Sequence, residues 1–527
     1  MRIPSVMTHD FSRVPRADIP RSSFDRSHGL KTAFDAGFLI PIFCDEALPG
    51  DTFSLNMTGF ARLATPLHPF MDNVYMSTFF FAVPMRLVWA NTQKFFGEQE
   101  NPGDSTDYLV PQLVAPAGGY AEDSVYDYFG LPTGIAGITH SALPLRAYNL
   151  IYNEWFRDQN LQTSAPMSKG DGPDTTTWYS LRRRGKRHDY FTSALPWPQK
   201  GPSVDIPLGT DAPIKGIGIQ STGNTTGGTP PFRQTLNNES SGSWASLSAP
   251  NWYGRVNGAA SATQRPMIYA DLTEATAATI NQLRQAFQIQ KLYERDARGG
   301  TRYTEIIRAH FNVVSPDARL QRPEYLGGGT SIVNLHTVPQ TNASEVSSTP
   351  QGNLAAYGTS TLNGHGFSKS FTEHCIIIGL VSVRADLNYQ QGMNRMWSRR
   401  TKFDFYWPAL AMIGEQAILN KEIYTQGTTA DDDVFGYQER FAEYRYKPSM
   451  ITGVMRSSAA QSLDTWHLAQ DFSTLPALNA SFIQDNPPIA RVIAVPSEPH
   501  FIFDSYFRLR CARPMPVYGV PGLIDHF

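Results

Sequence analysis

The stretch Val74-Tyr-Met-Ser-Thr-Phe-Phe-Phe-Ala-Val83 decides the fold of this 527-residue chain. Apolar side chains occupy both alternating faces of this run, which is typical of a strand in the middle of a sheet that is covered on both sides. Pro84 then ends the strand, because proline has no N–H to donate to a neighbouring strand. The run therefore predicts a sheet with further layers on both of its faces.

Other strands are predicted on either side of this run. Phe53, Leu55 and Met57 alternate with polar neighbours, which is the two-residue period of a strand with one buried face. Strands near both ends of the chain, joined by very long connections, favour a mainly β fold in which the terminal strands pair in an antiparallel jelly-roll sandwich. Further strands are predicted at Phe38–Phe43, Phe371–Asp386, Thr401–Trp407 and His500–Arg510.

Two helices are also predicted. Leu150, Tyr152 and Trp155 stand at helical spacing and indicate a helix at Leu145–Phe156. Asp271-Leu-Thr-Glu274 fits a capping box, in which an N-cap side chain and the residue three positions on satisfy each other's backbone N–H groups. A second helix is therefore expected to begin there.

The organisation of the chain follows shifts in composition. Pro4, Pro15 and Pro20 forbid a continuous helix near the N-terminus, which is interpreted as an extended arm or as a merely disordered terminus. Gly, Ser, Thr, Asn and Pro dominate from about residue 203, which indicates a surface insertion or an ordinary flexible loop. The predicted segments are an arm at 1–35, the N-terminal half of the sandwich at 36–202, the insertion at 203–268, a helix, long loops and the C-terminal half of the sandwich at 269–510, and a tail at 511–527.

The composition indicates a surface that is buried in protein contacts. Charged residues make up 17% of the chain and aromatic residues 12%, whereas an ordinary domain has roughly 25% charged residues. Interface cores lose Lys, Glu and Asp and gain aromatic residues, although a monomeric enzyme can share this composition. The net charge of −2 argues against a protein whose whole surface neutralises nucleic-acid phosphates.

The sequence lacks the common local motifs of enzymes and cofactor sites. It contains no phosphate-binding GxxxxGK[ST] loop, no GxSxG elbow and no HExxH motif, so we expect neither an enzyme nor a bound cofactor. The three cysteines lie far apart, without the spacing of a zinc site or a disulfide framework. Asp431-Asp-Asp433 is interpreted as a solvated turn rather than a metal site, and no metal ligand is predicted. Neither a signal peptide nor a membrane span is expected.

One basic run concentrates positive charge. Aromatic residues flank it, so it could hold the phosphates of single-stranded DNA while the rings stack on bases. A solvated loop or a subunit contact is the alternative, because arginine also forms paired hydrogen bonds at protein interfaces. The cations of this run are Arg182, Arg183, Arg184, Lys186 and Arg187.

Several segments resemble the major capsid protein of the gokushoviruses, a branch of the small tail-less icosahedral bacteriophages with circular single-stranded DNA. The resemblance spans nearly the full length, and its segments together are highly specific. The resembling segments include RVPRADIPRSSFDRSHGLKTA at Arg13–Ala33, LRAYNLIYNEWFRDQN at Leu145–Asn160, RHDYFTSALPWPQKG at Arg187–Gly201 and PMPVYGVPGLIDHF at Pro514–Phe527.

The resemblance implies an eight-stranded jelly roll of the viral-capsid type and a sixty-copy T=1 icosahedral shell around a single-stranded DNA genome. It further implies an internal scaffolding protein, a pilot or minor capsid protein and a small basic DNA-binding protein as partners, with assembly in the bacterial cytoplasm before residence in the virion. The large insertion would project at the threefold axes and attach to a host surface receptor.

Candidate contact residues follow from that implication. The insertion offers Thr222, Asn224, Thr229, Trp244 and Trp252 toward a receptor. The arm and tail offer Arg13, Arg16, Arg21, Phe24, Tyr518 and Phe527 toward neighbouring subunits. Two rival functions stay open: a carbohydrate-binding or carbohydrate-active β-sandwich protein, and a nucleic-acid-binding protein centred on residues 182–188.

Overall fold

The computed structural model describes residues 20–204, 280–342 and 351–518, together with the backbone of strands β8–β13 between residues 214 and 270. The chain divides into two units. One comprises Met1–Pro198 and Ala297–Phe527, and the other comprises Gln199–Asp296. The first unit carries the sandwich and most of the helices.

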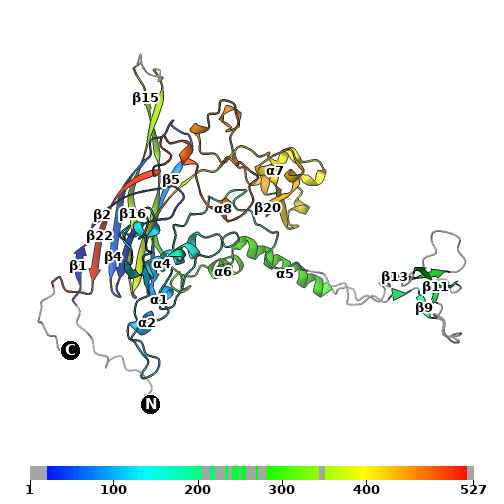
Figure 1. The fold of residues 1–527 in the computed structure, drawn as a ribbon, viewed down its shortest axis with the longest axis horizontal. Coiled ribbons are helices and arrows are strands. Elements are labelled where there is room, and N and C mark those ends of the chain that lie inside the picture. The colour runs from blue at the N-terminus through cyan, green and yellow to red at the C-terminus, as the bar shows by residue number, and fades with distance from the viewer. Residues whose placement is uncertain are drawn as a thin grey trace. The chain divides into compact units, whose positions relative to one another are not determined.

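The first sheet joins the two ends of the chain. Its central strands are β22 (Phe501–Arg513) and β4 (Thr52–Leu63), which pair antiparallel along twelve residues. The strands β1 (Ser22–Asp25) and β2 (His28–Phe34) both pair with the outer edge of β22. Beyond β4 follow β16 (Leu354–Ser370) and β15 (Asn334–Pro339) (Figure 1).

The second sheet has the order β14 (Glu324–Ile332), β5 (Val74–Pro84), β17 (Cys375–Ala385) and β3 (Ile40–Ala47), again antiparallel. Along the chain, β2, β4, β16 and β22 lie in the first sheet, and β3, β5, β14 and β17 in the second. This is the connectivity of an eight-stranded jelly roll, so the predicted fold class is confirmed.

Alternation decides which side chains enter the core. Along β22, Phe501, Phe503, Phe507 and Leu509 are buried, while every second residue between them is exposed. The strand β5 is buried on both faces, as its sequence predicts. Met76 and Phe80 on one face fill the space between the sheets, and Phe81 and Val83 on the other face belong to a second core.

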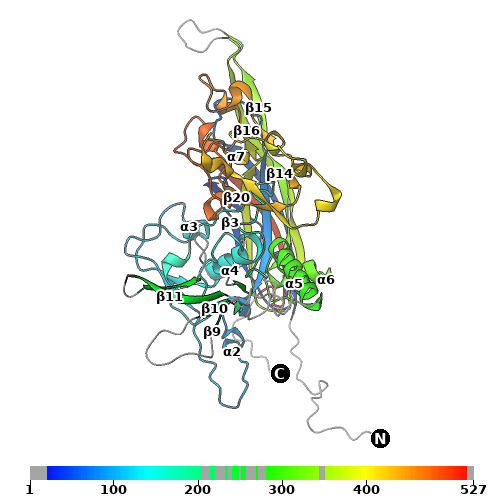
Figure 2. The same ribbon diagram turned by 90° about the vertical axis from the view of Figure 1, so that its right-hand side faces the viewer.

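That second core lies between the β5 sheet and a layer of helices. The helices are α1 (Met85–Val88), α2 (Thr92–Phe95), α3 (Val125–Tyr128) and α4 (Leu143–Ile151), which continues as a π-helical turn at Tyr152–Phe156. The helix predicted at Leu145–Phe156 is thereby confirmed. Helix α3 contacts β3, and α4 contacts β17 and β5 (Figure 2). The short strands β6 (Gln112–Val114) and β7 (Thr139–Ser141) pair beside them.

A buried ion pair ties this layer together. The guanidinium of Arg146 on α4 donates to both carboxylate oxygens of Asp174, at 2.8 and 2.6 Å, and both side chains are almost wholly buried. Arg146 also donates to the carbonyls of Val88 and Gly170, and the Tyr179 hydroxyl donates to Asp174. Removing one partner of such a pair leaves an uncompensated buried charge, so the pair fixes the surrounding loops on the helix.

The connection between β17 and β22 is a second large excursion from the sandwich. It contains β18 (Asn388–Tyr389), β19 (Glu415–Leu419), β20 (Val434–Glu439), β21 (Ser449–Met450), α7 (Asn420–Ile423) and α8 (Ala480–Ile483). The strand predicted at Thr401–Trp407 is wrong. A short 3₁₀ helix at Lys402–Asp404 stands there, because the Asp404 carboxylate accepts the backbone N–H groups of Arg400 and Thr401 and closes a turn.

The second unit contains the predicted insertion at 203–268. Its backbone forms a four-stranded sheet of β9 (Ile217–Ile219), β10 (Phe232–Gln234), β11 (Ser240–Ser248) and β12 (Asn251–Val256), and a pair of β8 (Ile214–Lys215) with β13 (Tyr269–Ala270). Helix α5 (Ile280–Gly299) leads back to α6 (Tyr303–Phe311) in the first unit. The predicted helix start at Asp271 lies outside the described residues. Within the described parts of both units, no helix is long and apolar enough to cross a membrane.

The register of β22 predicts opposite effects for two adjacent residues. Phe503 is fully buried between the sheets and Ile502 is 63% exposed on the outer face. Phe503→Ala should therefore lower the free energy of unfolding by about 3–5 kcal/mol, whereas the matched control Ile502→Ala should change it by less than about 0.5 kcal/mol. Urea unfolding of the unassembled chain, followed by tryptophan fluorescence, measures both. Equal losses would contradict the assigned register.

Candidate interfaces

The basic segment at residues 182–187 is threaded between the sandwich and the 386–500 connection. The backbone N–H of Leu39 donates to the carbonyl of Arg182, and that of Arg184 donates to Gly37. On the other side, the N–H groups of Asp485 and Lys186 bond to the carbonyls of Arg184 and Ile483. The segment is therefore fixed by backbone bonds on both sides, and is not a free solvated loop.

Each of the five cations lies over an aromatic ring of the same chain. The guanidinium of Arg183 is 3.8 Å from the ring centre of Phe38, and that of Arg184 is 4.7 Å from Phe79. Arg182, Lys186 and Arg187 lie over Tyr152, Phe482 and Tyr75. Cation–π contacts of this kind are worth about 0.5–2 kcal/mol each, and they occupy ring faces that would otherwise be open to bases.

One buried carboxyl group faces this cluster. Burial raises the pKa of Asp485 to about 7, opposed by the charges of Arg384, Lys186, Arg184 and Arg183. Burial also lowers the pKa of Lys186 to about 8 and that of Arg184 to about 9. Desolvation thus makes the charged forms of Lys186 and Arg184 less favourable than they would be in water.

Two adjoining cavities open beside the segment. The smaller, of about 390 Å³, is lined by Phe79, Phe81, Phe156, Arg184 and Arg384, among others. The larger, of about 590 Å³, shares Trp155, Phe156 and Lys186 with it and extends to Arg302. Only Arg187 of the five cations is largely exposed, and it pairs with Asp386 at 2.7 Å. Of the other four, Arg184 and Lys186 line these cavities, so an anion would reach these two there.

The remaining predicted contact residues are widely spread. Arg21 donates to the Thr52 hydroxyl at 2.6 Å, Phe24 on β1 stands opposite Cys511, and Tyr518 is exposed. Trp244 and Trp252 stand on β11 and β12, of which only the backbone is described. Arg13, Arg16, Thr222, Asn224, Thr229 and Phe527 lie outside the described residues.

The largest run of exposed apolar side chains in the described part of the chain was not predicted from the sequence. We call residues 396–413 the aromatic loop. Trp397 is 70% exposed and Met412 96% exposed, although both lie in an ordered connection. The signal was the run Lys402–Met412 (KFDFYWPALAM), which resembled a strand instead. The other exposed apolar members are Met396, Phe403, Phe405, Tyr406, Trp407 and Ile413.

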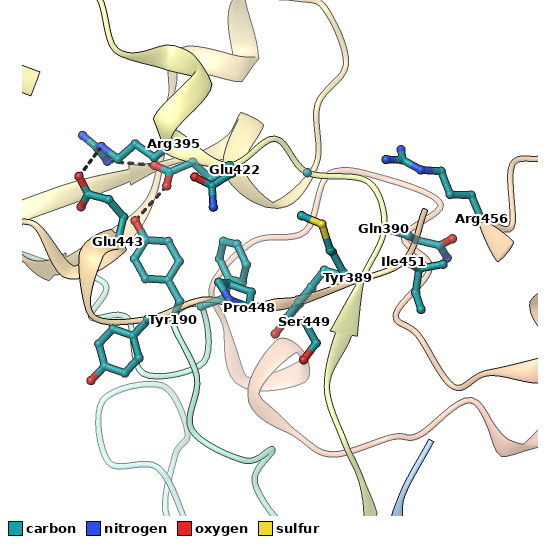
Figure 3. Close-up of a pocket in the computed structure, with 15 residues that line it drawn as sticks. Tyr190, Tyr389, Gln390, Arg395, Glu422, Glu443, Pro448, Ser449, Ile451 and Arg456 are labelled. Atoms are coloured by element: carbon teal, nitrogen blue, oxygen red, sulfur yellow. Dashed lines mark hydrogen bonds and ion pairs between the residues drawn. The ribbon is translucent and has the colours of Figure 1, made fainter. Parts of the chain in front are cut away.

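Ion pairs hold the base of the aromatic loop (Figure 3). Arg395 donates to the buried Glu422 at 3.0 Å, and its Nε lies 3.9 Å from Glu443. The Tyr190 hydroxyl also donates to Glu422, whose pKa burial raises. Arg399 pairs with Glu443 and stacks on Tyr444. These ion pairs thus fix the residues at the start of the aromatic loop to the rest of the connection.

The pocket in Figure 3 is a poor site for carbohydrate chemistry. Its cavity volume is about 70 Å³, well below the roughly 300–1,000 Å³ of typical ligand pockets. A glycosidase needs two carboxyl groups that flank the bond to be cut. Here Glu422 and Glu443 both face Arg395, so they brace the loop.

The acidic triplet at Asp431-Asp-Asp433 is engaged in local contacts. Asp431 accepts the backbone N–H groups of Gln426 and Gly427, and Asp432 pairs with Lys421 at 2.6 Å. Across the described ranges, no group of three or more His, Cys, Asp or Glu side chains is arranged to hold a metal ion. The triplet closes a turn.

Comparison with known proteins gives concordant matches. A family model described as "Capsid protein (F protein)" matches residues 12–523. The chain is 51% identical to "Capsid protein VP1" of Bdellovibrio phage phiMH2K, covering 98% of each chain. It is 47% identical to the protein of the same name from Chlamydia phage 1, covering 99% of each, and 39% identical to that of Spiroplasma virus 4, covering 98% of this chain and 97% of the relative.

The buried Asp485 predicts a pH dependence of stability. Because its pKa rises from an ordinary 3.8 to about 7 on folding, the folded chain binds more protons than the unfolded chain between about pH 4 and 7. The contribution of Asp485 to the free energy of unfolding should fall as the pH rises through that window, by up to about 1.4 kcal/mol per pH unit. Asp485→Asn should flatten the slope.

Urea midpoints measured at several pH values test this expectation. Asp104→Asn, which removes an intermediate-exposure carboxylate from a distant loop, is the control and should keep the slope of the native chain. An unchanged slope in Asp485→Asn would show that the carboxyl group is ionised throughout.

Proposed function

The chain belongs to the capsid protein (F protein) family, and from that premise we propose that it is the major subunit of a T=1 icosahedral shell that encloses a single-stranded DNA genome. Its relatives are capsid proteins of Microviridae-type phages, which makes it a structural protein of the virion rather than an enzyme. Assembly in the cytoplasm of a bacterial host is part of the proposal.

The aromatic loop is the observation that carries the proposal. Monomeric proteins seldom expose contiguous apolar patches larger than a few hundred Å², and such patches mark protein–protein contacts. Interface cores are enriched in Trp, Tyr, Phe, Met and Arg, which is the composition of this loop. Where the loop packs against a different surface of a neighbouring copy, the contact is heterologous and repeats around a symmetry axis until the ring closes.

Further contacts extend the proposal to other partners. The arm and tail, through Arg13, Arg16, Arg21, Phe24, Tyr518 and Phe527, would link neighbouring subunits. Arg182, Arg183, Arg184, Lys186 and Arg187 would face the genome through the cavities beside them. An internal scaffolding protein, a pilot protein and a small basic DNA-binding protein would act with the shell.

Host attachment is assigned to the insertion at 203–268, with Thr222, Asn224, Thr229, Trp244 and Trp252 as candidate receptor contacts. What supports this is that the insertion lies within a unit distinct from the sandwich, Gln199–Asp296. A sequence can vary in such a unit without disturbing the jelly roll. A protrusion at the threefold axes would then carry receptor specificity.

Charge placed in the aromatic loop should prevent assembly. Met412→Asp and Trp397→Asp should each raise the concentration needed for shell formation about tenfold or more, because a contact worth over about 1.4 kcal/mol is lost. Sedimentation and electron microscopy measure shells, and circular dichroism checks folding. Met71→Asp, at a residue 75% exposed outside the loop, is the matched control and should assemble normally. Normal assembly of both loop variants would refute the loop as a contact.

Replacement of residues 203–268 by a short Gly/Ser linker should separate assembly from attachment. We expect shells in normal yield, because the jelly roll is complete without the insertion, and adsorption to host cells reduced to background. Co-sedimentation of labelled particles with cells measures adsorption. Particles that lack the insertion yet adsorb normally would contradict this assignment.

A further inference from the structure

The outer face of the first sheet is uncovered in the described part of the chain. The helices α1, α3 and α4 contact the other sheet, and α7 and α8, in the same unit, lie away from β22 in Figure 1. The side chains exposed on this outer face stand on β22 and β4. They are Ile502, Asp504, Tyr506, Arg508 and Arg510 on β22, and Ser54, Asn56, Thr58, Phe60 and Arg62 on β4.

Two aromatic rings stand open on this face. Tyr506 is 52% exposed and Phe60 50% exposed. Tyr506 pairs with Thr58 on one side and with Gly29 on the other, so only short side chains flank its ring. Phe60 pairs with Asp504, two residues from Tyr506, which makes the two residues diagonal neighbours on the sheet. Among the cations that the structure describes, none lies over either ring, in contrast to the rings that the basic segment covers.

The charges of the face favour an anionic partner. Four cations, Lys31, Arg62, Arg508 and Arg510, stand against two carboxylates, Asp25 and Asp504, although the whole chain carries −2. Lys31 pairs with Asp504 at 3.2 Å, and Asp25 accepts hydrogen bonds from Ser27.

The three arginines of the face are only weakly engaged within the chain: Arg510 stands opposite Asp25 in the pairing of β1 with β22, and Arg508 and Arg510 both interact electrostatically with that carboxylate. Among the described residues, Arg62, Arg508 and Arg510 form no ion pair within 4.0 Å. On β4, Asn56 and Ser54 stand opposite Arg508 and Arg510. The face therefore presents positive charge and neutral hydrogen-bonding groups around its two rings.

We propose that this sheet face binds single-stranded DNA, with bases stacked on Tyr506 and Phe60 and phosphates paired with Arg62, Arg508 and Arg510. Alternate residues of a strand are about 6.8 Å apart, so the groups follow one another along a rigid track. Stacking platforms combined with a cationic track bind single strands with little sequence preference. The neutral Ser54, Asn56 and Thr58 fit that mode, since they donate or accept hydrogen bonds with any nucleotide.

The inference rests on the proposed function in one respect, namely that the strand is the packaged genome. It adds a DNA contact apart from the basic segment, whose cations already lie over the protein's own rings. A second copy of the chain fits the face less well than DNA. The three arginines of the face would require matching carboxylates on that copy. The experiment nevertheless distinguishes DNA binding from a role of this face as a contact with a neighbouring subunit.

The experiment measures fluorescence anisotropy of a labelled dT₂₀ strand with the full-length chain over a range of salt concentrations. Arg508→Ala/Arg510→Ala should weaken binding and lower the slope of log affinity against log salt by about 1.4, since each phosphate contact to a single strand contributes about 0.7. Tyr506→Ala should weaken binding about fivefold to a hundredfold, the worth of one stacked base. Tyr506→Phe, which keeps the ring, should bind like the native chain.

The matched control is Arg319→Ala/Arg456→Ala, which removes the same charge from exposed positions elsewhere and should keep the native salt slope. Equal losses in both double variants, or native affinity in Arg508→Ala/Arg510→Ala, would overturn the inference. Shell formation is followed in parallel by sedimentation. Variants of the face that bind DNA normally but fail to assemble would identify the face as a subunit contact, and this result would also overturn the inference. Failure of the native chain to form shells would instead count against the proposed function.

Discussion

The pairing of β5 with β17 is the constraint on which the rest of the structure depends. Both strands are buried on both faces, so the sheet that contains them must be covered twice. The first sheet covers one face, with Phe80 packed in the core between the sheets. The helix layer covers the other, where Phe81, Ile376 and Ile378 meet the side chains of α4. Because the second sheet takes the helices on its outer side, the first sheet keeps an outer face of alternating polar and aromatic residues that no helix needs to cover.

Buried charges give the long connections their shape. Arg146 and Asp174 hold the loops of the helix layer, and Arg395 with Glu422 and Glu443 holds the base of the aromatic loop. Desolvation makes each of these pairs costly if one partner is lost. Exposed aromatic residues can therefore be displayed on rigid supports without collapsing onto the core. A shell subunit needs this property, since its contact surfaces must keep their shape before a neighbour covers them.

The sequence predicts the strands that obey simple periods. The strands β4, β5, β17 and β22 and the helix at α4 follow from the spacing of apolar residues. The strands β14 and β16 do not, because they are rich in glycine. A side chain at Gly327 would stand 2.4 Å from the carbonyl oxygen of Gly366, so these glycines allow the edges of the two sheets to approach. The strand predicted at Thr401–Trp407 failed for the opposite reason, because its aromatic residues are exposed. Alternation alone does not say whether a ring faces the core of its own chain or a neighbouring subunit.

Sequence reasoning is limited in the same way when it selects candidate sites from charged residues. The cations at 182–187 are conspicuous because they are adjacent in sequence, yet each is already stacked on a ring of its own chain. Arg62 and Arg508 are separated by most of the chain, and only the antiparallel pairing of β4 with β22 puts them on one face. The electrostatic field that a phosphate backbone meets depends on the spatial density of cations and on how few carboxylates compete with them. Proximity in sequence ensures neither of these conditions. The uncovered outer face of the first sheet is therefore a stronger candidate for nucleic-acid binding than the basic segment, even though no sequence motif marks it.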